Sequence, residues 1–107
     1  MPHYLVQATY TGESWAAQVS EPKDVRDRIR PAIESLGGSL EGFYYTFGED
    51  DMIAILQFPD AVTAAGFGIA ASSSASAFKM TPLLTVEEGM EAMKVAGRSG
   101  YRPPASA

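Results

Sequence analysis

The sequence lacks cysteine, has one histidine (His3) and is poor in basic residues. Without cysteine the chain can form no disulfide, thiolate metal site or cysteine nucleophile. A single histidine cannot build a multi-histidine metal site or an ordinary catalytic triad. The chain has 8 Lys and Arg residues and 13 Asp and Glu residues, which gives a net charge of −5. This balance disfavours binding to the phosphate backbone of a nucleic acid.

Long hydrophobic runs are also missing, because no stretch approaches the ~20 apolar residues of a membrane span. The first residues show no basic segment followed by an apolar one, so we expect no signal peptide and no membrane association. The 107 residues are 46% hydrophobic and 20% charged, which is typical of a single globular domain. We therefore expect a cytoplasmic protein that holds no cofactor and no metal.

The strongest structural signal runs from Gly42 to Pro59 (GFYYTFGEDDMIAILQFP). It predicts two strands, Leu40 to Phe47 and Met52 to Phe58, joined by a tight turn at Gly48-Glu49-Asp50-Asp51. The three carboxylates of this turn could ligate a hard cation. A solvated hairpin turn is the favoured interpretation, since adjacent carboxylates do not converge easily.

The remaining elements follow from periodicity and capping signals. They are a strand over His3–Tyr10, a helix starting at Ser20-Glu21-Pro22 and ending at Gly37-Gly38, a helix over Ala61–Ala71 capped by Asp60, a strand over Phe78–Leu84, and a short helix capped by Thr85 and Glu88. The order β-α-β-β-α-β predicts an α+β, ferredoxin-like fold with an antiparallel four-stranded sheet. Pro82 places the fourth strand at an edge. We expect one domain over residues 1–97 and a flexible C-terminal tail over residues 98–107.

The predicted first helix carries a cluster of three arginines, Arg26, Arg28 and Arg30. The cluster could bind an anion. Because acidic residues interleave with the arginines, a solvated helix surface is the favoured interpretation.

Alternation along the strands assigns their residues to two sheet faces. The face predicted to meet the helices is almost wholly apolar: Tyr4, Val6, Ala8, Tyr10, Phe43, Tyr45, Phe47, Met52, Ala54, Leu56, Phe58, Phe78, Met80 and Leu84. The opposite face is mixed: Leu5, Gln7, Thr9, Tyr44, Thr46, Ile53, Ile55, Gln57, Lys79, Thr81 and Leu83. Its apolar centre would be exposed in a monomer, so we expect a homodimer with sheets packed face to face.

Polar groups on the mixed face are the candidate ligand-binding residues: Gln7, Tyr44, Thr46, Gln57 and Thr81. They could form structural hydrogen bonds in the dimer interface, or they could line a pocket for a small molecule. His3 at the end of the sheet is a further candidate, as a general base, although a lone terminal histidine is more often structural. No catalytic residue is identified.

Three stretches resemble the GYD domain family, a group of small, mostly bacterial proteins. They are Gly37-Gly38-Ser39-Leu40-Glu41-Gly42-Phe43-Tyr44-Tyr45-Thr46-Phe47-Gly48-Glu49, Asp51-Met52-Ile53 with Pro59-Asp60, and Thr81-Pro82-Leu83-Leu84-Thr85-Val86-Glu87-Glu88. Gly48 and Asp51 match the family's name motif, whereas Asp50 stands where tyrosine is usual. The resemblance implies a dimeric α+β barrel and brings no agreed catalytic residues.

These observations favour a small homodimeric module that binds a small molecule or has a structural role. The alternative is a cofactor-free enzyme, oxygenase- or isomerase-like, that uses the mixed sheet face, and it rests on fold-level analogy. Nucleic-acid binding is disfavoured because the acidic chain has no basic stripe with interleaved aromatic residues.

Overall fold

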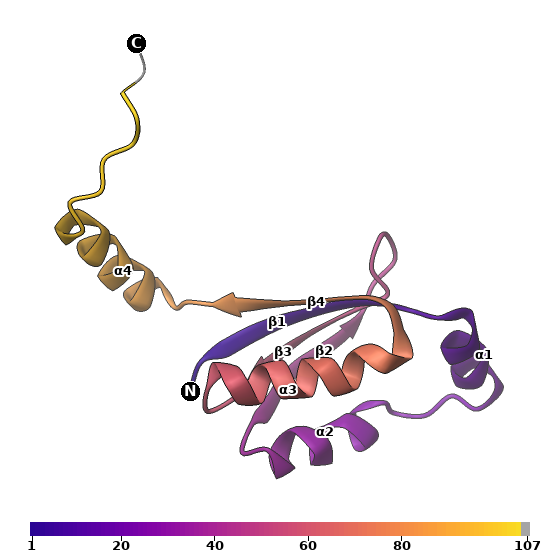
Figure 1. Ribbon diagram of the computed structural model, residues 1–107. Coiled ribbons are helices and arrows are strands. Elements are labelled where there is room, and N and C mark those ends of the chain that lie inside the picture. Colours follow the sequence, from indigo (N-terminus) through magenta and orange to yellow (C-terminus); the bar gives the residue numbers. More distant parts are fainter. Residues whose placement is uncertain (106–107) are drawn as a thin grey trace.

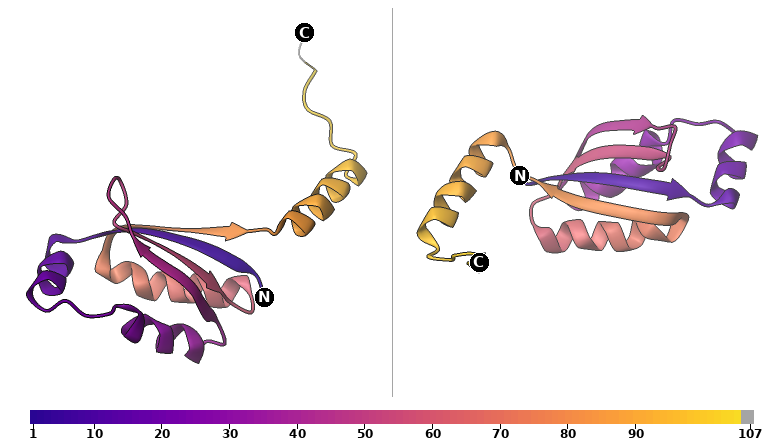
Figure 2. Two further views of the ribbon diagram at one scale, coloured as in Figure 1. Left: turned by 180° about the vertical axis from the view of Figure 1, so that it is seen from behind. Right: turned by 90° about the horizontal axis from the view of Figure 1, so that it is seen from above.

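The computed structural model describes residues 1–105 as one four-stranded sheet and its helices. The elements in chain order are β1 (His3–Tyr10), α1 (Gly12–Ser20), α2 (Arg26–Ser35), β2 (Ser39–Tyr45), β3 (Met52–Gln57), α3 (Ala61–Ala71), the 3-10 turn η1 (Ser72–Ser74), β4 (Ala75–Leu83) and α4 (Val86–Arg98). All strand pairs are antiparallel, in the order β2-β3-β1-β4. The predicted α+β, ferredoxin-like fold is confirmed, as are the edge positions of β2 and β4. Helices α2 and α3 cover one face of the sheet and leave the other face open (Figures 1 and 2).

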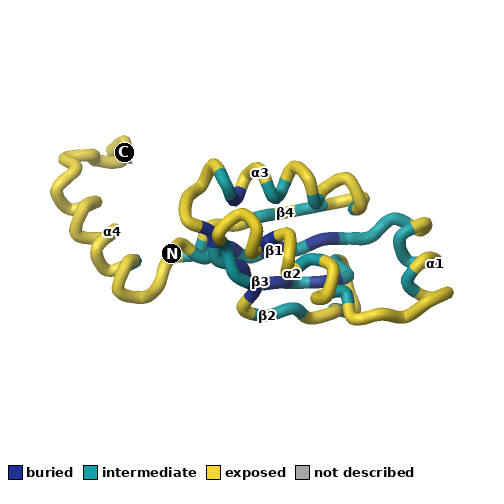
Figure 3. The backbone as a smooth tube through the Cα atoms, turned by 90° about the horizontal axis from the view of Figure 1, so that it is seen from below, coloured by how far each residue is buried: buried dark blue, intermediate teal, exposed yellow. Residues whose placement is uncertain are grey.

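The core lies between the sheet and these two helices, and its largest fully buried side chains are Phe58, Ile33 and Leu56. Burial is concentrated on the central strands β1 and β3 (Figure 3). Many of the residues predicted to face the helices lie on these two strands. Buried residues alternate strictly along β1 and β3, so only one strand register buries all of them on the same face.

The prediction that Phe47 and Leu84 face the helices is wrong. Phe47 is fully exposed and Leu84 is 63% exposed. Phe47 lies beyond the end of β2, in the connection to β3. The Thr46 amide donates to the Asp51 carbonyl at 2.9 Å, and the Asp51 amide donates to the Ala8 carbonyl of β1 at 2.8 Å, so the two ends of the connection are held to the sheet and Phe47 lies outside it. Leu84 follows the last residue of β4. The predicted tight turn is therefore a longer connection that spans residues 46–51.

The prediction of a helix starting at Ser20-Glu21-Pro22 is wrong. Helix α1 ends at Ser20, and its N-cap is Thr11, whose hydroxyl accepts from the amide of Ser14. Helix α2 starts only at Arg26, where the Asp24 side chain accepts from the Arg26 amide at 3.0 Å. This local hydrogen bond satisfies one of the free amides of the first turn and moves the helix start beyond the proline.

Two glycines end α2 as predicted. Gly37 has φ +81°, a left-handed conformation that favours glycine. A Cβ on Gly38 would lie 2.4 Å from the carbonyl oxygen of Gln57 and 2.8 Å from the ring of Phe58. Gly38 therefore lets the chain enter β2 in close contact with the end of β3.

Helix α4 projects away from the sheet (Figure 1). The predicted capping box is present, since the Thr85 hydroxyl accepts from the Glu88 amide and the Glu88 carboxylate accepts from the Thr85 amide. The Cα radius of gyration is 17.5 Å, against about 13 Å for a compact domain of this length. Arg98, the first residue of the predicted tail, ends α4, and residues 106–107 lie outside the described residues. Within residues 1–105 no helix is long and apolar enough to cross a bilayer.

Candidate functional site

At one end of the open sheet face, polar side chains gather around Glu41. The Nε2 atom of His3 lies 3.1 Å from Oε1 of Glu41, and the Gln57 amide donates to the same oxygen. His3 and Gln57 are paired residues of β1 and β3, while Glu41 comes from β2. The structure thus brings two of the predicted ligand-binding residues together and ties both to a carboxylate.

At the other end, the polar groups gather around Asp50 in the β2–β3 connection. Gln7 Nε2 donates to its carboxylate at 3.4 Å, and Lys79 Nζ lies 3.7 Å from the same oxygen. The Thr46 hydroxyl donates to the backbone carbonyl of Asp50 at 2.6 Å, and the Thr9 hydroxyl donates to that of Glu49 at 3.1 Å. These bonds hold the connection across β1.

Tyr44 and Thr81 belong to neither group. Tyr44 is exposed on β2 opposite Ile53, and Thr81 is exposed on β4 opposite Leu5. The six predicted binding residues therefore share one face but do not converge on a single point. Their role in ligand binding stays a prediction.

The acidic turn has a structural connection through Asp51. Its Oδ2 accepts from the backbone amide of Tyr10 at 2.9 Å and from the indole Nε1 of Trp15 at 3.1 Å. One carboxylate thus joins the β2–β3 connection to the end of β1 and to α1. Among residues 1–105 there is no group of three or more histidine or carboxylate side chains placed to hold a metal ion.

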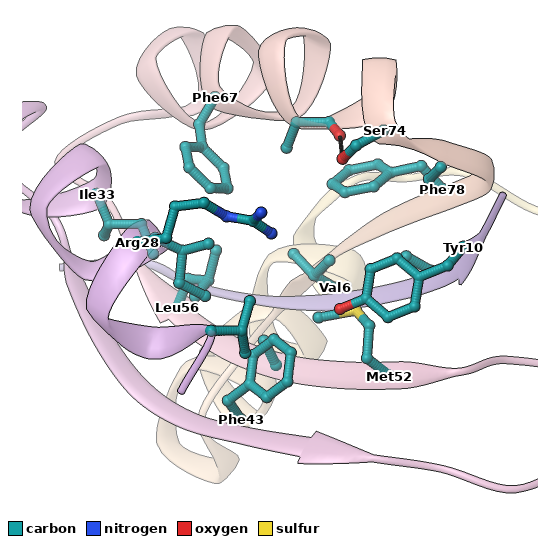
Figure 4. A pocket seen from close by; sticks show the side chains of 16 residues that line it. Val6, Tyr10, Arg28, Ile33, Phe43, Met52, Leu56, Phe67, Ser74 and Phe78 are labelled. Carbon is teal, nitrogen blue, oxygen red and sulfur yellow. Dashed lines mark hydrogen bonds between the residues drawn. The ribbon is translucent and has the colours of Figure 1, made fainter. Parts of the chain in front are cut away.

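A cavity of about 80 Å³ lies on the other side of the sheet, under α2 and α3 (Figure 4). Its lining is mainly apolar and includes Val6, Ala54, Leu56, Phe43, Phe67 and Phe78. Sequence reasoning missed it. The signal that could have indicated it is the number of alanines on the core side of these elements, since small side chains leave space between a sheet and its helices. Four of them line the cavity: Ala8, Ala54, Ala71 and Ala75.

Three polar side chains also line this cavity: Tyr10, Arg28 and Ser74. The Arg28 guanidinium extends across the cavity in Figure 4, and none of the ion pairs formed within residues 1–105 involves it. Burial, followed by the neighbouring Tyr45, raises the pKa of Tyr10 to about 12, so its hydroxyl stays protonated at neutral pH. The Ser74 hydroxyl donates to the Ala71 carbonyl at 3.1 Å and keeps lone pairs to accept with.

A wider open groove of about 860 Å³ adjoins this cavity. It runs between α1, the connection to α2 and η1, and it shares Val25, Arg28 and Ser74 with the apolar cavity. Its lining is mostly polar, with acidic residues that include Glu13 and Asp27. Arg28 therefore lies where an apolar interior meets a hydrated groove.

Comparisons with known proteins identify a family and a fold. The GYD domain family model matches residues 4–93, and no curated protein matches significantly. A solved structure described as the "Gly102Thr mutant of Rv3291c" superposes with a TM-score of 0.54 at 15% identity, covering 99% of this chain and 56% of that chain. A structure described as "MtbAldR (Rv2779c)" has a TM-score of 0.49 at 14% identity, with 99% and 57% covered. The chain thus spans little more than half the length of these two proteins, and the first supports the fold alone.

Proposed function

The chain belongs to the GYD domain family, and we propose that it is a cytoplasmic, homodimeric small-molecule-binding module whose copies pair through their open sheet faces. The observation that carries this proposal is the apolar centre of a sheet face that no helix within residues 1–105 covers. Leu5, Ile53 and Ile55 lie side by side there, partly exposed on the central strands β1 and β3. Contiguous exposed apolar surface is a feature of interaction sites.

The rest of the face suits a second copy of the same face. It carries charges of both signs, with Glu41 near one end and Lys79 beside Asp50 near the other, so two copies need not bring like charges together. A standard interface removes about 800 Å² per partner, which is roughly a tenth of the 7489 Å² accessible surface of this chain. The aromatic ring of Tyr44, 63% exposed, adds a side chain of the type enriched at interfaces.

Helix α4 supports the same assembly. Val86, Met90 and Met93 form a stripe along one side of it and are all more than half exposed. Isolated helices of 13 residues are marginal in water, so a stable α4 needs a surface to pack on. In the proposed dimer the second copy supplies that surface. Met93→Glu should weaken the dimer, whereas Glu91→Gln, on the opposite side of α4, should leave it unchanged in sedimentation velocity.

Native mass spectrometry of freshly purified protein tests the proposal, because it reports the assembly and any retained small molecule together. We expect a dimer of two 11.4 kDa chains with additional mass from a bound molecule. A bare monomer at micromolar concentration would contradict the dimer. A bare dimer that shows no thermal shift across a panel of metabolites would leave only a structural role.

The enzyme alternative gains no support from the described residues. The polar side chains of the open face are divided between two ends, and the single histidine is hydrogen-bonded to Glu41 rather than to a candidate nucleophile.

A further inference from the structure

We propose that the cavity under α2 and α3 binds a small monocarboxylic acid, with its hydrocarbon chain inside the cavity and its carboxylate on Arg28. This inference deepens the binding role proposed above and assigns it a site, which lies on the sheet face opposite the proposed dimer interface. The described residues that line it all belong to one copy of the chain.

The interior of the cavity defines the body of the ligand. Its floor and walls are aliphatic and aromatic side chains, such as Leu56, Phe67 and Phe78, so it suits a hydrocarbon group. A volume of about 80 Å³ would hold several waters, since one needs roughly 10–15 Å³ on this measure. By the same measure a ligand of roughly five to eight non-hydrogen atoms fits.

The mouth of the cavity defines the head group. Arg28 lines both the cavity and the adjoining groove, and Tyr10 lines the cavity. Neither side chain makes a hydrogen bond to another residue drawn in Figure 4. The positive charge of Arg28 lowers the pKa of Tyr10 against the larger effect of burial, as expected for two groups that line the same cavity. A guanidinium and a neutral phenol are both hydrogen-bond donors, and a carboxylate can accept from each of them.

The surroundings of Arg28 favour a single negative charge. Asp24 is held by Arg26, whose Nε and Nη2 donate to its two oxygens at 2.9 and 2.8 Å, so this carboxylate does not compete for Arg28. Glu13 and Asp27 line the adjoining groove, and their charges would repel a ligand that extends further anionic groups into it. A monocarboxylate therefore fits better than a phosphate or a dicarboxylate. An amine would meet the positive charge of Arg28.

Hexanoate has the required size and is the probe for a titration followed by ¹H–¹⁵N NMR of the full chain. We expect a dissociation constant in the millimolar range, as is usual for so small a ligand. The largest chemical-shift changes should occur at the amides of the residues of α2, α3, β1 and β3 whose side chains line the cavity. Hexan-1-ol should bind at least several-fold more weakly and hexylamine should not bind.

Two pairs of variants test separately the charge of Arg28 and the volume of the cavity. Arg28→Met should weaken hexanoate binding about ten- to a hundredfold, as expected for a lost charge-assisted hydrogen bond. Arg30→Met, an exposed arginine on the same helix, should not change it. Ala71→Leu should fill the cavity and block both hexanoate and hexan-1-ol, while Ala70→Leu, on the exposed side of α3, should block neither.

Equal affinity for hexanoate in Arg28→Met and the parent would overturn the proposal, as would shifts confined to the open sheet face or an absence of binding at tens of millimolar. This failure is distinguishable from failure of the proposed function. A monomer that still binds hexanoate through Arg28 would contradict only the dimer, and a dimer that retains a different molecule would contradict only the site assigned here.

Discussion

Replacing Asp51 by alanine should destabilise the fold far more than replacing its acidic neighbours. The Oδ2 atom of Asp51 accepts from two separate donors, the Tyr10 amide and the Trp15 indole, at 2.9 and 3.1 Å. A hydrogen bond to a charged group contributes about 1.5–3 kcal/mol. Because both donors share one half-buried oxygen, we expect a total loss of about 2–4 kcal/mol rather than the sum of the two maxima.

Thermal and urea unfolding, followed by the fluorescence of the single tryptophan, measure this loss. A loss of about 2–4 kcal/mol lowers the melting temperature of a domain of this size by roughly 10–20 °C. Glu49→Ala is the matched control: its side chain is exposed, so we expect a change within ~0.5 kcal/mol. Asp50→Ala should fall between the two, since its partners lie at 3.4 and 3.7 Å. Equal effects of Asp51→Ala and Glu49→Ala would refute the structural role of Asp51.

Three further predictions concern single groups in the chain. Gly38→Ala should lower the free energy of unfolding by about 1–3 kcal/mol, because the new Cβ would lie 2.4 Å from a backbone oxygen. Gly66→Ala should raise the free energy of unfolding by up to ~1 kcal/mol, because a Cβ at this helix position meets open space. Chemical denaturation of both variants measures these changes. The Thr85 amide lowers the pKa of Glu88 below its ordinary 4.5. The cap therefore stabilises α4 fully above pH 4.5, and this stabilisation is lost as the pH falls through the lower pKa that Glu88 has in the folded chain. An NMR titration of the Glu88 carboxyl group, with the helical circular dichroism signal followed over the same pH range, would detect the loss. The pKa of Tyr10 rises from 10.0 to about 12 on folding, so the free energy of unfolding should fall as the pH rises through that interval. In an absorbance titration of the tyrosines, the parent chain should show a phenolate step near the raised pKa of Tyr10, and Tyr10→Phe should lack it.

The strand assignments and the two sheet faces could be predicted because they depend on local alternation. Along β1 the pattern from Tyr4 to Ala8 admits one buried register, and β3 repeats it opposite. The order of the elements then restricts the topology to the ferredoxin-like arrangement, so the edge positions of β2 and β4 follow.

The errors arose where tertiary contacts decide the local structure. The register of β2 shifts between Leu40 and Gly42, and the strand ends before Phe47, which alternation alone had placed in the core. The start of α2 is set by a hydrogen bond from the Arg26 amide to Asp24 rather than by the preceding proline.

The alanines on the core side are a sequence signal for space under the helices, but the volume of the cavity could not be predicted because it depends on how α2 and α3 pack over the sheet. Arg28 illustrates the point. Its sequence neighbours, Arg26 and Arg30, are as basic and as exposed, yet of the three only Arg28 lines the cavity. The interleaved acidic residues favour a solvated surface for all three arginines, and they do not indicate which arginine lies over an apolar interior.

The measurement that tests the proposed assembly most directly is sedimentation equilibrium of two charge-insertion variants. Ile53→Glu places a carboxylate in the apolar centre of the open face, while Val62→Glu places one on the exposed side of α3, where Val62 is 83% exposed. We expect Ile53→Glu to be a folded monomer, and Val62→Glu to remain a dimer like the parent chain. A dimer of undiminished affinity in Ile53→Glu would contradict pairing through the sheet face.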